Sequence, residues 1–126
     1  MVGADSVSLE SLIAKVKAHP KISKAGMILC HNGIVREFDR SGARKVSGLR
    51  VAVNRAEIEG IRLWAESQPG IVAVEIQAFE GDFRVGDDLL FVVVAGDIRE
   101  NVFAIMRETV DKIKTGGVAK TEFYSD

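Results

Sequence analysis

An unbroken apolar run at residues 89–96, followed at once by a helical pattern, constrains the fold of this chain more than any other feature. The run has the length of a strand and is far too short to cross a bilayer. Behind it, Asp97 and Glu100 have the spacing of a helix N-cap and its third residue. Apolar residues then recur at helical spacing: Val102, Phe103, Met106, Val110 and Ile113. We therefore expect a strand at residues 89–94, with this helix packed on it through all five apolar side chains.

The remaining pattern adds two helices and further strands. Ser8 and Asn54 are the expected N-caps of the two helices, and Gly116 and Gly117 are expected to end the last helix in the left-handed conformation. Strands are expected at residues 25–30, 46–53, 72–76, 83–85 and 118–124, with a loop at residues 38–43. The predicted order is α-β-β-α-β-β-β-α-β. Because the strands come in adjacent groups, this order favours an α+β fold over a doubly wound sheet.

Composition narrows the classes of function. The 126 residues are 47% hydrophobic, which is enough for one domain, residues 1–126, around one core. The formal net charge of -1 provides no overall attraction to nucleic acid or to an anionic membrane, so we expect neither partner. The single cysteine, Cys30, excludes an internal disulfide. The histidines and acidic residues do not have the spacing of metal ligands, so we expect no metal and no cofactor. The N-terminus has no signal-like run, which favours a cytoplasmic protein.

Four cationic residues gather at the ends of strands and of the last helix: Arg36, Arg99, Lys114 and Lys120. Arginine holds phosphate or carboxylate groups bidentately, and lysine acts as an acid or base when burial or a nearby cation lowers its pKa. Plainer interpretations stay open, namely a cation at a helix C-terminus for Lys114 and a solvent-facing strand residue for Lys120. Arg36 and Arg99 also fit ordinary surface positions, with Arg99 paired to Glu100 or Asp97.

Cys30 and His31 are adjacent on an expected strand. Adjacent strand residues point to opposite faces, so the two side chains do not form a nucleophile–base pair. We expect Cys30 to be buried, as free cysteines usually are.

In the order and spacing of four segments, the chain resembles the large, catalytic subunit of molybdopterin synthase, the MoaE family. The segments are Gly33-Ile34-Val35-Arg36, then Val74-Glu75-Ile76 through Phe83-Arg84-Val85-Gly86-Asp87, then Val92-Val93-Val94 through Arg99 and Phe103, and finally Ile113-Lys114 with Lys120-Thr121-Glu122. The resemblance implies an α/β hammerhead with additional antiparallel strands, and a homodimer. It also implies a small ubiquitin-like sulfur carrier, MoaD-like, whose C-terminal Gly-Gly thiocarboxylate enters the site.

The same resemblance implies that sulfur passes to a cyclic pyranopterin phosphate and forms molybdopterin. Carried over residue by residue, Lys114 and Lys120 are the catalytic residues, while Arg36, Arg99 and Glu122 bind substrate. Two readings remain. The chain is either the active sulfur transferase or a degenerate, non-catalytic relative that keeps the dimer and an anion pocket. Ile98, where the family has histidine, and an end at Asp126, beyond which the family usually runs on, favour the second reading. The presence of all four cations of the family site favours the first, which is the function we expect.

Dimerisation has two further arguments in the sequence. Ala73, Ala78 and Phe79 are expected to leave an apolar edge that a second copy covers. Arg99 and Lys114 lie at opposite ends of one helix, which at about 16 residues is roughly 24 Å long. The two residues therefore meet in one site only if another subunit supplies one of them.

Overall fold

The computed structural model describes residues 7–125, and its elements follow the order expected from the sequence. Helices are α1 (Leu9–Lys17), α2 (Arg55–Glu66) and α3 (Arg99–Lys112), with a 3-10 turn η2 (Ile22–Lys24) and a π-helical turn η3 (Ile113–Gly117). Strands are β1 (Met27–Ile34), β2 (Val46–Val53), β3 (Ile71–Ala78), β4 (Gly81–Phe83), β5 (Asp88–Gly96) and β6 (Val118–Tyr124). None of the described helices is long and apolar enough to cross a membrane.

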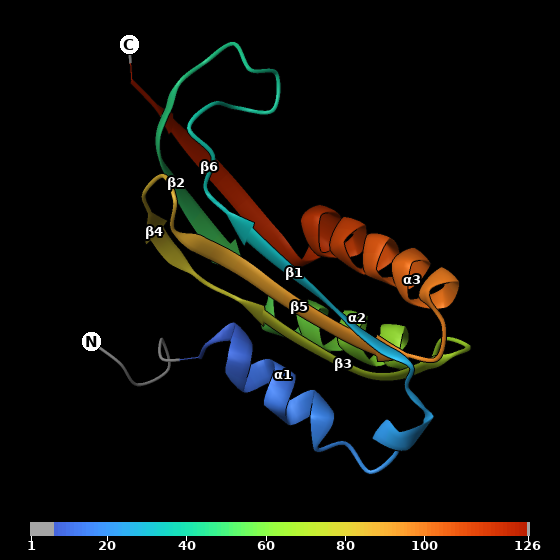
Figure 1. The fold of residues 1–126 in the computed structure, drawn as a ribbon. Coiled ribbons are helices and arrows are strands. Elements are labelled where there is room, and N and C mark those ends of the chain that lie inside the picture. Colours follow the sequence, from blue (N-terminus) through green and yellow to red (C-terminus); the bar gives the residue numbers. More distant parts are fainter. Residues whose placement is uncertain (1–6, 126) are drawn as a thin grey trace.

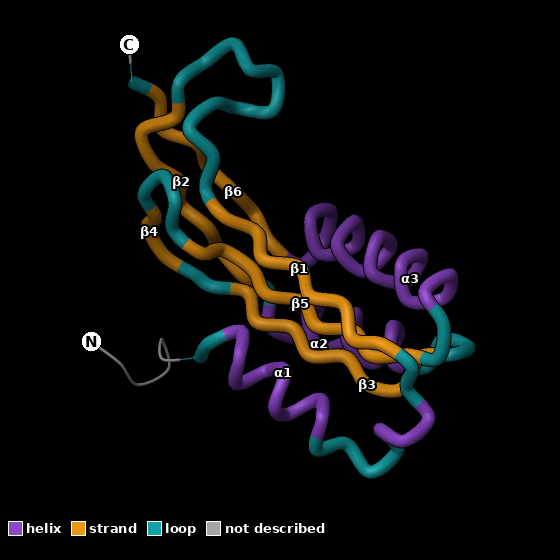
Figure 2. The backbone as a smooth tube through the Cα atoms, in the orientation of Figure 1, coloured by secondary structure: helices purple, strands orange, loops and turns teal. Residues whose placement is uncertain are grey.

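The strands form two three-stranded antiparallel sheets, in the orders β1-β5-β3 and β4-β2-β6. Figures 1 and 2 show the helices packed around the first sheet, while the second sheet extends away from them toward a long loop. That loop contains the expected irregular segment at residues 38–43, closed by an isolated bridge between Phe38 and Lys45. The α+β prediction is therefore confirmed.

Both faces of β5 are buried, which explains its continuous apolar sequence. Leu90, Val92 and Val94 point into the core formed with α2 and α3. Phe91 and Val93, on the other face, pack against α1 in a second cluster. A central strand covered by helices on both faces has no polar alternation to show, because neither set of side chains meets water.

Two helix caps are as predicted and one is not. The hydroxyl of Ser8 accepts a hydrogen bond from the backbone N–H of Ser11, and the Asn54 side chain accepts one from the N–H of Glu57, at 3.1 Å in each case. The expected cap at Asp97 is wrong by one residue, because Ile98 holds the N-cap position and makes no side-chain cap. The Asp97 carboxylate instead accepts hydrogen bonds from the Ile98 N–H and the Asn101 amide.

The buried stripe of α3 keeps four of the five expected residues and gains two others. Val102, Met106 and Ile113 are buried, with Val110 at the edge of the core. The prediction that Phe103 is buried is wrong, since 52% of its surface is exposed. The stripe is completed by Ile105 and Thr109. One helical residue turns by about 100°, so Phe103 lies off the stripe centred on Val102 and Met106.

Three further expectations need correction. Cys30 is exposed, because β1 is an edge strand and α1 covers only part of that face. The predicted strand at residues 83–85 is instead β4 (Gly81–Phe83), which ends before the turn that contains Gly86, a residue with a φ of 92°. Finally, Ala73 and Ala78 do not form an open apolar edge, since both are buried within the chain and Phe79 packs edge-on against Phe91.

Candidate functional site

The turn η3, which joins α3 to β6, is fixed by a residue on each side of it. Ile113 is fully buried, and Gly117 lies so close to α2 that a Cβ there would be 2.6 Å from Ile58 Cδ1. The expected left-handed ending at Gly116 and Gly117 is wrong, since neither residue has a positive φ. The wider π-helical turn redirects the chain instead. Such turns are rare and are frequently found at functional sites.

This turn presents Lys114 and leads directly to Lys120 and Glu122. In the antiparallel pairing of β6 with β2, Lys120 lies opposite Val51, and Glu122 lies opposite Leu49. Directly opposed residues share a face, and both partners on β2 are buried. Lys120 and Glu122 therefore project on the inner side of this sheet. A small cavity beside Lys120 is lined mainly by apolar groups of β5 and η3.

Arg36 reaches the same region from the end of β1. The preceding residue, Val35, is buried, and its N–H donates to the carbonyl of Asp87 at 3.0 Å. Its own carbonyl accepts from the N–H of Gly86 at 2.9 Å. These two bonds hold the start of the loop against the β4–β5 turn and so fix where the exposed Arg36 begins.

The charges of these residues act on one another. Although Lys120 is exposed overall, partial desolvation lowers its pKa below the usual lysine value, and Lys114 and Arg36 lower it further. Glu122 opposes the shift. Lysines of lowered pKa exchange protons more readily near neutral pH than ordinary lysines do. Arg36, Lys114, Lys120 and Glu122 thus form one cluster in the folded chain, which we call the cationic cluster.

Glu122 is tied to the outer end of the second sheet. Its carboxylate accepts a hydrogen bond from the Tyr124 hydroxyl at 2.7 Å, and the Arg44 guanidinium stacks over the Tyr124 ring at 3.6 Å. The Glu122 carboxylate therefore raises the pKa of Tyr124 and holds its hydroxyl protonated. A row of polar side chains runs from Lys120 along one face of β6.

Arg99 is the one predicted site residue that the single chain does not bring to the cluster. It opens α3, whereas Lys114 follows the end of that helix, and 14 residues span roughly 21 Å. The Arg99 side chain is 76% exposed and lies 3.8 Å from the Glu100 carboxylate. The plainer interpretation of Arg99, a surface arginine beside Glu100, describes its position in the isolated chain.

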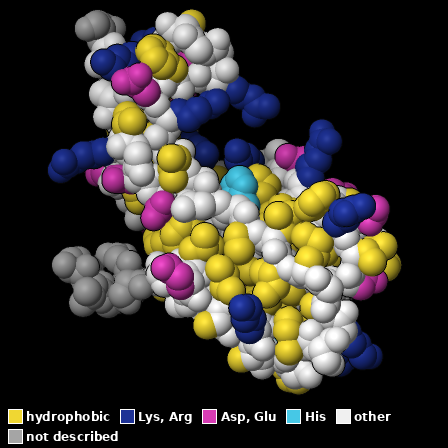
Figure 3. All heavy atoms as spheres, viewed as in Figure 1, with side chains coloured by type: hydrophobic (Ala, Val, Ile, Leu, Met, Phe, Trp, Pro, Cys, Tyr) yellow, Lys and Arg dark blue, Asp and Glu magenta, His cyan; other side chains and the backbone are white. Residues whose placement is uncertain are grey.

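His31 lies beside the cationic cluster, although sequence reasoning did not select it. Desolvation lowers the pKa of His31, and the charges of Lys114 and Lys120 lower it further. Figure 3 shows Lys and Arg side chains beside the hollow between the helical part and the second sheet. The signal for it was present in the alternation of β1, because Met27, Leu29 and His31 share a face and the first two pack on the core with α2 and α3.

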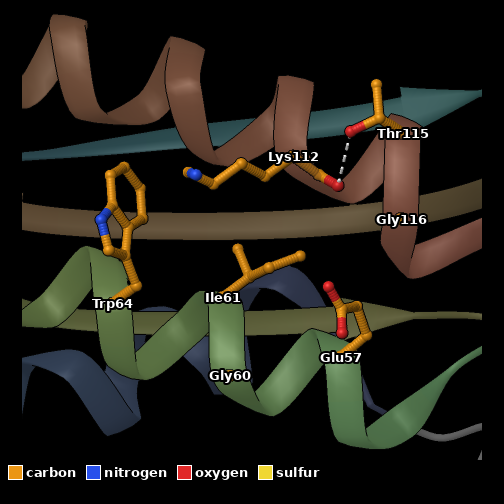
Figure 4. A pocket seen from close by; sticks show the side chains of 7 residues that line it. All are labelled: Glu57, Gly60, Ile61, Trp64, Lys112, Thr115 and Gly116. Atoms are coloured by element: carbon orange, nitrogen blue, oxygen red, sulfur yellow. Dashed lines mark hydrogen bonds between the residues drawn. The ribbon is translucent and has the colours of Figure 1, made fainter.

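On the other side of η3, a groove of about 400 Å³ lies between α2 and the end of α3. Figure 4 shows Lys112 extended across this groove toward Trp64, with its Nζ atom 4.5 Å from the centre of the ring. Lys112 therefore points away from the cationic cluster, even though it is only two residues from Lys114. Within residues 7–125 there is no group of three or more histidine, cysteine or acidic residues that could hold a metal ion.

Known proteins resemble this chain in sequence and in fold. A probable molybdopterin synthase from Haloferax volcanii is 27% identical over 112 residues, which cover 86% of this chain and 43% of that protein. The chain thus spans less than half of the length of this curated relative.

Solved structures match the fold more completely. Molybdopterin cofactor biosynthesis protein E from Burkholderia multivorans has a TM-score of 0.73 and 24% identity, over 95% of this chain and 82% of that one. A chain from the complex of subunits 1 and 2 of the molybdopterin-converting factor from Helicobacter pylori has a TM-score of 0.67 and 18% identity, over 95% and 85%. At such identities the likeness is one of fold, and it confirms the expected MoaE-like architecture.

The model of one family, the MoaE protein, matches residues 2–116. The match includes Arg36, Arg99 and Lys114 and stops before Lys120 and Glu122, which join the cluster through the pairing of β6 with β2. Since it extends over most of the sequence, this chain belongs to the MoaE family.

Proposed function

We propose that this chain is the catalytic subunit of a molybdopterin synthase. It would transfer sulfur from the C-terminal Gly-Gly thiocarboxylate of a small MoaD-like carrier to a cyclic pyranopterin phosphate, in the cytoplasm and as one MoaE-like domain. The observation that carries the proposal is the convergence of Arg36, Lys114 and Lys120 beside η3. A carrier partner is in keeping with the Helicobacter pylori protein, which was solved as a complex of two subunits.

The proposed roles follow from the chemistry of the cluster. The guanidinium of Arg36 holds the substrate phosphate through paired hydrogen bonds, with Glu122 orienting neighbouring polar groups. When the carrier sulfur bonds to a substrate carbon, an oxygen leaves that carbon and needs a proton. Water then cleaves the acyl–sulfur bond, which leaves the sulfur on the substrate and releases the carrier as a carboxylate. Lys120, whose pKa is lowered by desolvation and by its cationic neighbours, is suited to donate that proton. Lys114 stabilises the negative charge that develops.

The test is sulfur transfer by the purified chain, mixed with a thiocarboxylated MoaD-like carrier and the pterin precursor, with the sulfur-containing product measured by mass spectrometry. Lys114→Ala and Lys120→Ala should each abolish product while leaving the urea unfolding midpoint nearly unchanged, since both side chains are exposed. Lys112→Ala is the matched control, because this exposed lysine points into the groove of Figure 4. Full activity in either cluster variant would remove that lysine from the mechanism.

Site completion requires Arg99, and we propose that a second copy supplies it in a homodimer. Arg99 and Phe103 are four residues apart on α3 and so lie on one face of the helix. Phe103 is 52% exposed, and the neighbouring Ile98 is also exposed, so this face offers apolar surface beside the arginine. A crystal soaked in sulfate should then show an anion that contacts at least one arginine and one lysine.

Sedimentation equilibrium at micromolar concentration tests the dimer. Phe103→Glu should shift the protein toward monomer, whereas Leu63→Glu, at an equally exposed position on α2, should not. A wild-type protein that is only monomeric would refute the dimer. The shared site fails if Arg99 lies more than about 15 Å from every Lys114 and Lys120 in the assembly, well beyond the screening length at physiological salt.

The second candidate function is a non-catalytic MoaE relative that binds an anion. Ile98 stands where the family has histidine, and this substitution is the specific observation that favours it. Sulfate binding by the cationic cluster without any sulfur transfer by the wild-type chain would select this alternative.

A further inference from the structure

His31 lies at the inner side of the first sheet, close to where α3 ends. On β1 it pairs with Val92 of β5, and it shares its face with Leu29, which packs on the core under α2 and α3. The side chain is half-buried. It is thus neither a fully packed core residue nor a freely solvated one.

Gly33 gives the imidazole its room. A Cβ at Gly33 would lie 3.3 Å from His31 Nε2, which is closer than ordinary packing allows. The ring therefore lies along β1, over the glycine, with Nε2 on the side from which the strand continues to Val35 and Arg36. The ring nitrogen is directed toward the segment that carries the cluster's arginine.

The charged groups around His31 are cationic, with one carboxylate farther along the sheet. Lys114 from η3 and Lys120 from β6 both act on the imidazole, and with desolvation they lower its pKa. Arg36 and Glu122 act on Lys120 in turn, with opposite signs. From β5, the residue paired with His31 is the uncharged Val92. These neighbours therefore favour the neutral imidazole more than an ordinary histidine environment does.

A bound anion would instead favour the protonated form of His31. We propose that His31 takes up a proton from solvent when a phosphate-like dianion binds beside Arg36, Lys114 and Lys120, so that the imidazolium becomes a further cation of the site. Binding of the proton and of the anion are then linked, and each strengthens the other by the same factor. The inference rests on the anion site of the proposed function but does not depend on sulfur transfer.

The experiment is an NMR titration of the two histidine rings in the full chain, with and without saturating inorganic sulfate and at matched ionic strength. Sulfate keeps its double charge throughout the titration, so only the protein changes protonation. His19 is the internal control, because it follows α1 and its Nδ1 atom accepts a hydrogen bond from the Lys21 N–H. Without sulfate, His31 should titrate below the ordinary histidine range, because desolvation and the two lysines lower its pKa.

With sulfate, the His31 midpoint should rise by about 1 pH unit, which corresponds to about tenfold tighter sulfate binding by the protonated form. The His19 midpoint should move far less. Lys114→Ala should raise the His31 midpoint of the free protein and reduce its response to sulfate. His31→Gln keeps a neutral polar side chain and should remove most of the gain in sulfate affinity between pH 8 and pH 5, roughly tenfold in the wild type.

Three results would overturn the inference, and they are distinguishable. If sulfate shifts the amide signals of the cluster but leaves the His31 midpoint unchanged, the anion site stands and the coupling to His31 is refuted. If sulfate does not bind at the cluster at all, the coupling and the anion-holding role of Arg36 fall together. The sulfur-transfer assay then decides separately whether the chain is a transferase. An equal response of wild type and Lys114→Ala would also refute the coupling.

Discussion

Replacing Ile113 by alanine should strongly destabilise the chain, because this side chain joins the core to the turn that carries Lys114. Ile113 is fully buried, and its Cγ2 atom lies close to Gly117 and hence to α2. The substitution removes three carbon atoms, each contributing about 0.8 kcal/mol of transfer free energy, and adds the cost of the cavity that remains. We expect a loss of about 3–4 kcal/mol in the free energy of unfolding.

Leu63→Ala is the matched control. It also removes three carbon atoms, but Leu63 lies on α2 and is 53% exposed. Substitutions at such positions usually change stability by about 0.5 kcal/mol or less. The contrast isolates burial, since the two variants lose the same number of carbon atoms.

Urea unfolding, followed by circular dichroism at one protein concentration, measures both variants. With a denaturant dependence of roughly 1–3 kcal/mol per molar urea, Ile113→Ala should lower the midpoint by on the order of 1–4 M, and Leu63→Ala should barely move it. Equal losses, or a loss under about 1 kcal/mol for Ile113→Ala, would mean that η3 is not anchored through Ile113.

Two further predictions concern a buried hydroxyl and the pH dependence of the cluster. Thr109 is fully buried and its Oγ1 atom has no hydrogen-bond partner within the described residues. Thr109→Val should therefore leave the unfolding free energy unchanged or raise it by about 1 kcal/mol in urea melts. A clear loss of stability would show that the hydroxyl makes a hydrogen bond. The pKa of Lys120 is lowered, so sulfate affinity measured by calorimetry should fall with rising pH already below the ordinary lysine range, and Lys114→Ala should move this fall to higher pH because one repelling charge is gone. A fall at the same pH in both proteins would show that the two ammonium groups are not coupled.

Local sequence signals were sufficient to predict the order of elements. Ser8 and Asn54 mark two helix starts through side chains that bond to backbone groups only three residues away. The limits of β2 and β6 follow from composition in the same local way. Such signals need no knowledge of the rest of the fold, and for this reason they are reliable here.

The side of α3 that faces the core was harder to predict. Five apolar residues of α3 fit a helical repeat, but Val102 and Phe103 are adjacent and cannot both be at the centre of one buried stripe. Val102 is the buried residue of the two because it packs beside Gly96. A Cβ at Gly96 would lie 2.6 Å from Val102 Cγ2. This contact joins the end of β5 to α3. Only the tertiary packing decides it, and the helical repeat alone leaves Phe103 and Val102 equivalent.

The same distinction explains which parts of the site were predictable. Lys114 and Lys120 were selected because two glycines permit a turn between them, and the turn does bring them together. The inward direction of Lys120 depends on the register of β6 against Val51 of β2, and a shift of one residue would have turned the side chain to the other face.

His31 carries no sequence motif, because it neither pairs with Cys30 nor has partners at metal-ligand spacing. Alternation correctly separates the two side chains, but it also assigns His31 to the face of Leu29, which α3 covers. A half-buried histidine on the covered face must meet whatever follows the end of α3, and that segment carries Lys114. The arrangement therefore places a neutral base among cations without any motif to mark it. The site thus lies where the inner face of an edge strand meets the end of the helix that covers it.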